Sequence, residues 1–212
     1  MPRTSKKPKL STFRVRTNIY NKSKYHLALE LFYGSNINKD SAKALILLQE
    51  LAEQNDMNSI MLLGIIYYGL EVGDTHITPD YEKSFGWFRK AAVLENKVAL
   101  KRLEEDSEKG FKEAQNHLGC MYYNGQGVGQ DYAKAADLLK KSADQEYAPA
   151  QYNLGVMYKN GKGVPQDYAT AAELLKKSTE QGCALAQNNL GVIFHRKKLS
   201  FLKDAMRKLI GI

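Results

Sequence analysis

The chain repeats itself with a period of 36 residues, and this period limits its possible folds more than any other feature. The segment AQNHLGCMYYNGQGVGQDYAKAADLLKKSA begins at Ala114, and AQYNLGVMYKNGKGVPQDYATAAELLKKST begins at Ala150, 36 residues later. Leucines followed by glycine mark the same position in successive units, at Leu118, Leu154 and Leu190. A repeat of this length is one supersecondary unit that buries its apolar face only against a neighbour, so the units must stack.

The same spacing extends toward the N-terminus. Leu27 and Leu63 lie 36 residues apart. Four extra residues in the loop GLEVGDTHITP, which predict an insertion at 71–78, then move the next marker to Leu103. Leu118 follows Leu103 after only 15 residues, so one unit has lost about 21 residues. We predict one continuous helix over 103–115 in place of a hairpin; a spacer helix between two repeat blocks is the alternative.

Each complete unit is predicted to form two helices joined by a glycine-rich turn. The turn NGQGVGQD interrupts the helical pattern, because glycine readily adopts the positive φ of a helix C-cap. Asp131 and Asp167 stand where an N-cap belongs. Gly119 lies inside the first helix, where a small residue lets two helix backbones approach closely. The buried face of the second helix is predicted to carry Tyr132, Ala135, Ala136, Leu139 and Ala143.

These features predict an all-α fold, a right-handed α-solenoid of stacked antiparallel helix hairpins over residues 23–212. The units are marked near 27, 63, 103, 118, 154 and 190. A terminal unit needs a cap with a polar outer face, and we predict a capping helix at 197–210. An amphipathic membrane helix is the alternative for this segment. Its apolar face would carry Leu199, Leu202, Met206, Leu209 and Ile210.

Charge is concentrated at the two ends. Residues 1–29 carry eight Lys or Arg and no acidic residue, and residues 195–212 carry six against one, Asp204. The body, 30–194, has 17 basic and 22 acidic residues. We predict a basic, disordered tail at 1–22. An organelle-targeting sequence and electrostatic attachment to nucleic acid or anionic lipid are the alternatives for this tail.

Localisation is predicted from what the sequence lacks. No apolar run reaches the roughly 18–20 residues of a membrane span, and residues 1–29 lack the apolar core of a secretory signal. Two cysteines are too few for a disulfide framework. We therefore expect a cytoplasmic protein, with organelle import through the basic N-terminus or non-classical secretion as alternatives.

No catalytic or metal-binding pattern emerges from the sequence. The four histidines are scattered and none pairs with Cys or a carboxylate at ligand spacing. Cys120 and Cys183 align with apolar residues of neighbouring units, which favours packing roles. The glycine turns lack the spacing of a phosphate loop. We expect no catalytic residue, no metal and no cofactor, and a protein that is not an enzyme.

The pattern AxxxLGxxYxxGxGVxxDYxxAAxLLxKSAxxG resembles the Sel-one-like repeat, a short relative of the tetratricopeptide repeat. Two nearly complete copies lie between Ala114 and Ala186, and residues 25–97 hold two divergent ones. The sequence departs from the pattern at 103–115 and after Phe194. The resemblance implies an adaptor or scaffold that binds a protein on a concave surface. By position it implies partner-facing residues on the first helices, at Met61, Ile65, Tyr68, Asn116, Cys120, Tyr123, Tyr152, Val156, Lys159, Asn188, Val192 and His195.

Two functions from different classes follow. The first is a non-enzymatic module that holds a protein partner on the concave face of the repeats. The second is a factor associated with nucleic acid or an anionic membrane, in which the basic termini supply the affinity and the repeats act as a spacer. Neither function requires a small-molecule substrate.

Overall fold

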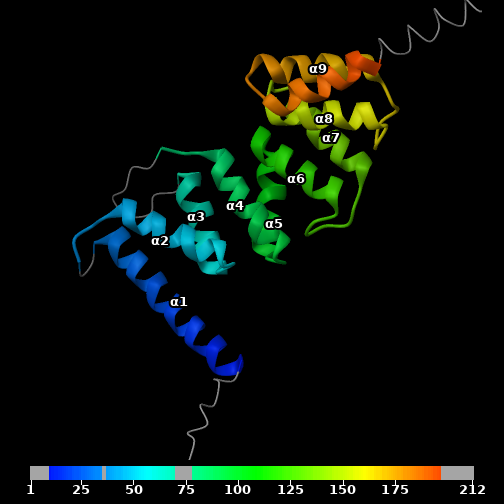
Figure 1. The fold of residues 1–212 in the computed structure, drawn as a ribbon. Coiled ribbons are helices and arrows are strands. Elements are labelled where there is room, and N and C mark those ends of the chain that lie inside the picture. Colours follow the sequence, from blue (N-terminus) through cyan, green and yellow to red (C-terminus); the bar gives the residue numbers. More distant parts are fainter. Residues whose placement is uncertain (1–9, 35–36, 70–77, 197–212) are drawn as a thin grey trace, which may run out of the picture. The chain divides into compact units, whose positions relative to one another are not determined.

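The computed structural model describes residues 10–34, 37–69 and 78–196, and within these ranges all regular secondary structure is α-helical. Two compact units divide the chain, Met1–Ala91 and Ala92–Ile212, and each is described by itself. Figure 1 shows the helices of both units. The all-α prediction is confirmed, as is the stacking of helix hairpins.

The first unit contains α1 (Leu10–Tyr33), α2 (Ser41–Glu53), α3 (Met57–Tyr68) and most of α4 (Tyr81–Val93). Helix α2 packs against both α1 and α3. Gly64 of α3 lies against α4, because a Cβ at this position would come within 2.6 Å of the Phe88 ring. The Ser84 hydroxyl of α4 donates to the Gly64 carbonyl oxygen at 2.8 Å. The buried core of this unit includes Ala28, Phe32, Leu48, Leu51, Ile60, Leu63 and Phe85.

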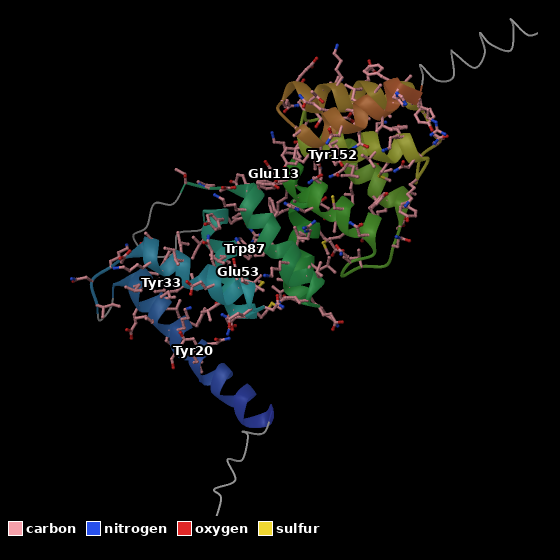
Figure 2. The ribbon with its side chains drawn as sticks, in the orientation of Figure 1. Tyr20, Tyr33, Glu53, Trp87, Glu113 and Tyr152 are labelled. Carbon is pink, nitrogen blue, oxygen red and sulfur yellow. The ribbon has the colours of Figure 1, made fainter. Side chains whose placement is uncertain are left out.

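Helix α1 starts at Leu10, so residues 10–22 form its first half and not part of the disordered tail predicted at 1–22. The segment from Leu10 to Tyr33 contains no glycine or proline, so nothing in it interrupts a helix. At its centre, Asn21 Nδ2 donates to Gln54 Oε1 at 3.2 Å, and Lys24 forms an ion pair with Glu50. Figure 2 shows Tyr20 and Tyr33 on this helix.

The second unit contains α5 (Lys97–Glu108), α6 (Lys112–Asn124), α7 (Tyr132–Ala143), α8 (Ala148–Asn160), α9 (Tyr168–Glu180) and a further helix over 184–196. Helices α6 and α7 form one hairpin, and α8 and α9 form the next. Helix α7 packs against α8, which stacks the two hairpins on each other (Figure 1). The buried face predicted for α7 is confirmed at Ala135, Ala136, Leu139 and Ala143.

Capping residues flank the turn between the two helices of each hairpin, as the repeat predicts. Asp131 accepts a hydrogen bond from the Lys134 backbone N–H at 3.0 Å, and Asp167 accepts one from the Ala169 N–H at 2.8 Å. Hydrogen bonds from the hydroxyl and backbone N–H of Thr170 hold the pKa of Asp167 below its ordinary value. The C-cap of each first helix is a glycine with positive φ: Gly125 (φ +67°) ends α6, and Gly161 (φ +66°) ends α8.

The glycine inside each first helix sits where the two helices of the hairpin meet. A Cβ on Gly119 would lie 2.9 Å from Leu139 Cγ, and one on Gly155 would lie 3.0 Å from Leu175 Cγ. The helix-propensity cost of glycine, about 1 kcal/mol, is therefore offset by close packing within the hairpin. A hydrogen bond also joins α7 to α6, because the Ser142 hydroxyl donates to the Lys112 carbonyl oxygen at 2.7 Å.

The shortened unit contains a single helix, α5, but this helix does not continue through 115 as predicted. It ends at Glu108, and residues 109–111 turn into α6 because Gly110 adopts φ +94°. In sequence, the start of α5 aligns with the first helix of a complete unit, with Leu103 as the marker leucine. The end of α5 aligns with the second helix of such a unit, with Asp106 at the position that Ser142 has in α7. Asp106 is fully buried and pairs with Arg102 at 2.5 Å and Lys109 at 2.8 Å.

Two other predictions fall on segments that the structure does not describe. The capping helix predicted at 197–210 lies outside the described residues, and so does nearly all of the insertion predicted at 71–78. Among the described helices, none combines the length and the apolar character that crossing a membrane requires.

Candidate functional site

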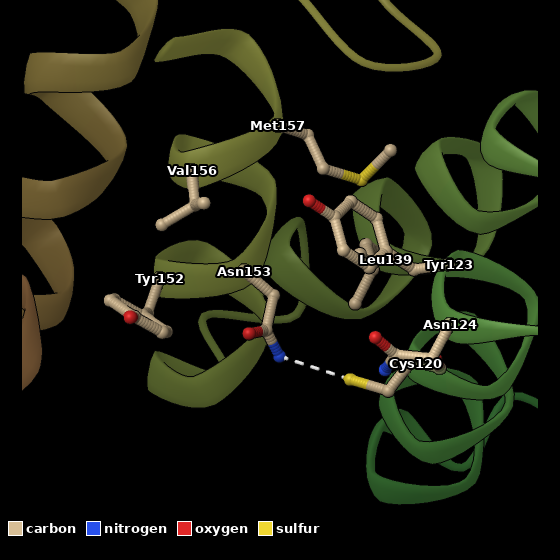
Figure 3. A pocket seen from close by; sticks show the side chains of 8 residues that line it. All are labelled: Cys120, Tyr123, Asn124, Leu139, Tyr152, Asn153, Val156 and Met157. Carbon is tan, nitrogen blue, oxygen red and sulfur yellow. Dashed lines mark hydrogen bonds between the residues drawn. The ribbon is translucent and has the colours of Figure 1, made fainter. Parts of the chain in front are cut away.

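A small pocket opens between α6 and α8, and the side chain of Leu139 from α7 also lines it. Its volume is about 230 Å³. The two first helices of the adjacent hairpins supply its walls, so the 36-residue repeat brings equivalent helix faces together. The side chains in Figure 3 are those of Cys120, Tyr123, Asn124, Leu139, Tyr152, Asn153, Val156 and Met157.

The Asn153 amide links the two walls. Its Nδ2 donates to Asn116 Oδ1 at 2.9 Å and to Cys120 Sγ at 3.3 Å, the second of which is drawn in Figure 3. Asn116 is 5% exposed, so the hydrogen bond satisfies an amide that has little access to water. On the other side of Cys120, Asn124 Nδ2 donates to the Cys120 carbonyl oxygen at 2.9 Å. The Asn153 bonds join α8 to α6, whereas the Asn124 bond lies within α6, and an amide group lines the pocket on each of the two helices.

An aromatic and cationic cluster borders the pocket at Tyr123. The rings of Tyr123 and Tyr132 meet edge to face with their centroids 5.2 Å apart. The Lys162 ammonium lies 5.3 Å from the Tyr123 ring centroid and 5.2 Å from that of Tyr132. The Tyr123 phenol, and then that of Tyr132, raise the pKa of Lys162 above its ordinary value. Lys162 therefore keeps its positive charge at this rim throughout the physiological pH range.

The chemistry of the pocket is that of contact and hydrogen bonding. Tyrosine, valine and methionine supply apolar surface, and asparagine amides supply donors and acceptors. A pocket of about 230 Å³ is smaller than the roughly 300–1,000 Å³ typical of small-molecule and cofactor sites. In the parts of the chain that the structure describes, no group of three His, Cys, Asp or Glu is arranged to hold a metal ion.

Several residues predicted to face a partner meet at this pocket. Cys120 and Tyr123 come from α6, and Tyr152 and Val156 come from α8; all four are half-buried and line the pocket. Asn116 lies beneath them, bonded to Asn153. The structure thus gathers five of the predicted residues from two adjacent repeats around one pocket.

The remaining predicted residues lie elsewhere. Lys159 donates to Asn189 Oδ1 at 2.5 Å, which joins α8 to the helix at 184–196. Asn188, Val192 and His195 are exposed on that last helix. In the first unit, the half-buried residues Met61, Ile65 and Tyr68 lie on α3. The Tyr68 ring packs edge to face against Tyr81 of α4, with the centroids 5.5 Å apart, so it contributes to the interior of its own hairpin.

Four residues that line the pocket lie outside the predicted set: Asn124, Leu139, Asn153 and Met157. Of these, Asn153 makes the hydrogen bonds between the two walls. It stands directly before the marker Leu154, a position outside the three carried over from tetratricopeptide repeats. His117 and Asn189 occupy the same place in the neighbouring units. A polar residue before the apolar marker recurs in these units, and this repetition is the signal that points to the position. At two of the positions the partner lies in the preceding unit, since Asn153 bonds to Asn116 and Asn189 accepts from Lys159.

The family assignment rests on four matches along the chain. The family model described as Sel1 repeat matches residues 21–56, 58–94, 112–147 and 148–183, which is more than half of the sequence. The chain belongs to the Sel1 repeat family. Residues 95–111, which hold α5, fall between the second and third matches. Proteins built of Sel1 repeats generally serve as scaffolds for protein–protein interaction.

Two solved structures similar to this chain carry Sel1-like descriptions. The protective antigen c5321 of uropathogenic Escherichia coli, described as having an SLR fold, is 28% identical over 90% of this chain, with a TM-score of 0.45. This chain spans 37% of c5321. A Sel1 repeat protein from Oxalobacter formigenes is 27% identical, with 69% of this chain and 96% of that chain covered and a TM-score of 0.41. A search of curated proteins found no match.

Proposed function

We propose that this Sel1 repeat protein is a non-enzymatic adaptor that holds a segment of a partner protein against the face formed by α6 and α8. The observation that carries the proposal is the convergence of Tyr123, Tyr152 and Val156 from two repeats on one pocket. Tyrosine is enriched among the residues that dominate protein–protein binding energy, because its ring offers a large contact area together with a polar tip.

The polar groups of the pocket favour a polypeptide as the ligand. Each wall carries one amide beside one tyrosine, Asn124 beside Tyr123 on α6 and Asn153 beside Tyr152 on α8. An amide side chain can both donate to and accept from a peptide backbone. The apolar floor formed by Leu139 and Met157 would receive one large side chain. A partner segment that supplies an anchor side chain and a backbone to pair with asparagine matches both features.

The rival function places the affinity in the basic termini. Attachment to nucleic acid depends on phosphate contacts and weakens steeply as salt rises, whereas an interface built on desolvated tyrosines does not. The two functions therefore predict different behaviour in one capture experiment. Because residues 10–22 belong to α1, the basic charge should be removed by substitution and not by deletion.

The experiment uses the full chain as bait in a native lysate, at low and at moderate salt. A matched bait carries glutamine at the six basic positions nearest the start, which are Arg3, Lys6, Lys7, Lys9, Arg14 and Arg16. We expect the same protein partners on both baits and at both salt concentrations. Capture of nucleic acid or lipid alone, lost with the basic charge or with salt, would overturn the adaptor proposal.

A further inference from the structure

The first helices of the second unit, and the turns that follow them, carry charge of one sign. The segments 114–130, 148–166 and 184–196 contain no Asp or Glu. Their lysine and arginine residues are Lys159, Lys162 and Arg196. The pocket between α6 and α8 is lined from these segments, apart from Leu139 of α7. Any ligand at this pocket therefore meets side chains that are neutral or positive.

Acidic residues of this unit occur instead at helix caps and on the second helices. Asp131 and Asp167 each accept hydrogen bonds from backbone N–H groups at the start of their own helices. On α7 and α9, carboxylates pair with lysines one turn away, in the ion pairs Asp137–Lys141 and Glu180–Lys176. The second helices thus present mixed charge that pairs within the helix, which distinguishes them from the first helices.

Lys162 is the cation that lies beside the pocket. Its ammonium is 5.3 Å from the centroid of the Tyr123 ring, which lines the pocket, and the side chain is exposed. Its neighbours are the phenols of Tyr123 and Tyr132, and within the described residues no carboxylate pairs with it. Lys162 therefore offers an accessible positive charge next to an apolar and amide-lined pocket.

We propose that the partner segment is acidic, with an Asp or Glu carboxylate that pairs with Lys162 while a neighbouring apolar side chain enters the pocket. This inference rests on the proposed adaptor function and names the chemistry of the partner. The ammonium lies 5.3 Å from a ring of the pocket, and an extended chain spans about 3.3–3.6 Å per residue. The carboxylate therefore belongs within about two residues of the apolar anchor.

The distribution of cations favours a polypeptide carboxylate over a nucleic acid. Affinity for nucleic acid depends on several phosphate contacts, each made by a separate cation. Of the three cations in these segments, Lys159 donates to Asn189 Oδ1, and Arg196 donates to the Tyr168 hydroxyl at 2.7 Å. Lys162 is the member of this group that contacts a tyrosine of the pocket. A single cation beside an apolar pocket matches one carboxylate beside an apolar side chain.

The first test is a selection from a library of random short peptides displayed on phage. The baits are the full chain and the full chain with Tyr123→Ala and Tyr152→Ala. We expect peptides that bind only the first bait to carry Asp or Glu within two residues of a large apolar residue, at least about threefold more often than the unselected library does.

The second test measures the contribution of Lys162 with one selected peptide, made synthetically. Lys162→Gln should weaken its binding about fivefold, and the matched control Lys177→Gln, which removes an exposed charge from α9, less than about twofold. The difference should shrink as the ionic strength rises from about 0.1 M to about 1 M. A peptide with lysine in place of its acidic residue should bind Lys162→Glu more tightly than the wild type. A structural role of Lys162 would not produce this exchange of preference.

The outcomes separate this inference from the function on which it rests. Selected peptides that need the two tyrosines but lack an acidic residue would overturn the inference and leave the adaptor function standing. Unchanged affinity in Lys162→Gln would do the same. If no selected peptide needs the two tyrosines, the adaptor function fails and the inference fails with it. Tighter binding of single-stranded oligothymidylate than of the peptide, lost in Lys162→Gln, would overturn the inference in favour of phosphate as the partner of this lysine.

Discussion

Replacing Gly163 with alanine is expected to lower the free energy of unfolding by roughly 3 kcal/mol, an effect at the upper end for a single substitution. Gly163 adopts φ +71°, and a Cβ there would lie 2.1 Å from the Tyr132 carbonyl oxygen. The left-handed conformation alone costs a non-glycine residue about 1–2 kcal/mol. The collision is with backbone, so the loop or α7 must move. Urea unfolding followed by circular dichroism measures the loss.

Gly129→Ala is the matched control, because it adds the same methyl group to the equivalent loop of the preceding repeat. No atom of the described chain lies within 4 Å of a Cβ at Gly129, and its φ is not in the left-handed region. The next repeat carries Pro165 at this position, so the backbone accepts a side chain. We expect a change within about 0.5 kcal/mol, in either direction. Equal losses of unfolding free energy in the two variants would contradict the close contact between Gly163 and α7.

The double substitution of Tyr123 and Tyr152 by alanine is expected to weaken partner binding at least 30-fold. One tyrosine at the centre of an interface contributes about 2 kcal/mol or more, which corresponds to roughly 30-fold in the dissociation constant. The two rings come from adjacent repeats and line one pocket, so their loss removes most of its aromatic surface. The captured partner, once purified, is titrated against the two proteins by calorimetry.

Tyr20→Ala with Tyr33→Ala is the control for this pair. Both tyrosines are exposed on α1, in the first unit (Figure 2). This variant removes the same two ring systems from the chain, and we expect its affinity to match that of the wild type. Because Tyr123 packs on Tyr132, the helical content and unfolding midpoint of each variant are compared first. Normal affinity of the Tyr123/Tyr152 variant would show that the partner binds another face.

Most of the fold could be predicted from the sequence because the same capping and contact positions recur in several units. Asp131 and Asp167 cap their helices as their spacing predicted, and Gly119 and Gly155 face a leucine of the paired helix. A single Gly inside a helix is ambiguous, but its recurrence with a 36-residue period identified it as a contact position. The 36-residue period thus distinguished glycines that pack against another helix from a glycine that occurs in a helix by chance.

The failures lie where the repetition breaks down. The end of α5 depends on the φ of Gly110, which aligns with Glu146 and Gly182 of the later units. All three residues have positive φ, so the aligned units marked this turn and the prediction of a continuous helix overlooked it. The start of α1 at Leu10 precedes the first repeat match, which begins at residue 21. Basic composition suggested a tail there, whereas the absence of glycine and proline permits a helix. At α1 the helix-forming tendency of the residues prevailed over their basic charge, whereas at the end of α5 the turn at Gly110 interrupted the predicted continuous helix.

The pocket itself was not predicted from the sequence. Four of its lining residues, Cys120, Tyr123, Tyr152 and Val156, belong to the set that the resemblance to tetratricopeptide repeats implied would face a partner. The Asn153 link depends on a contact across two units, between an amide on α8 and Asn116 on α6 at 2.9 Å. Such pairing requires the distance between stacked helices, and this distance follows only from packing in three dimensions.

The most direct test of the adaptor proposal is a photo-crosslink from the pocket to the captured partner. A photo-reactive amino acid is placed at Val156, which lines the pocket, and in a second protein at Glu173, which is exposed on α9. The proposal predicts a covalent adduct with the partner from position 156 and none from position 173. An adduct from position 173 alone would contradict it and would place the partner on the face that carries the second helices.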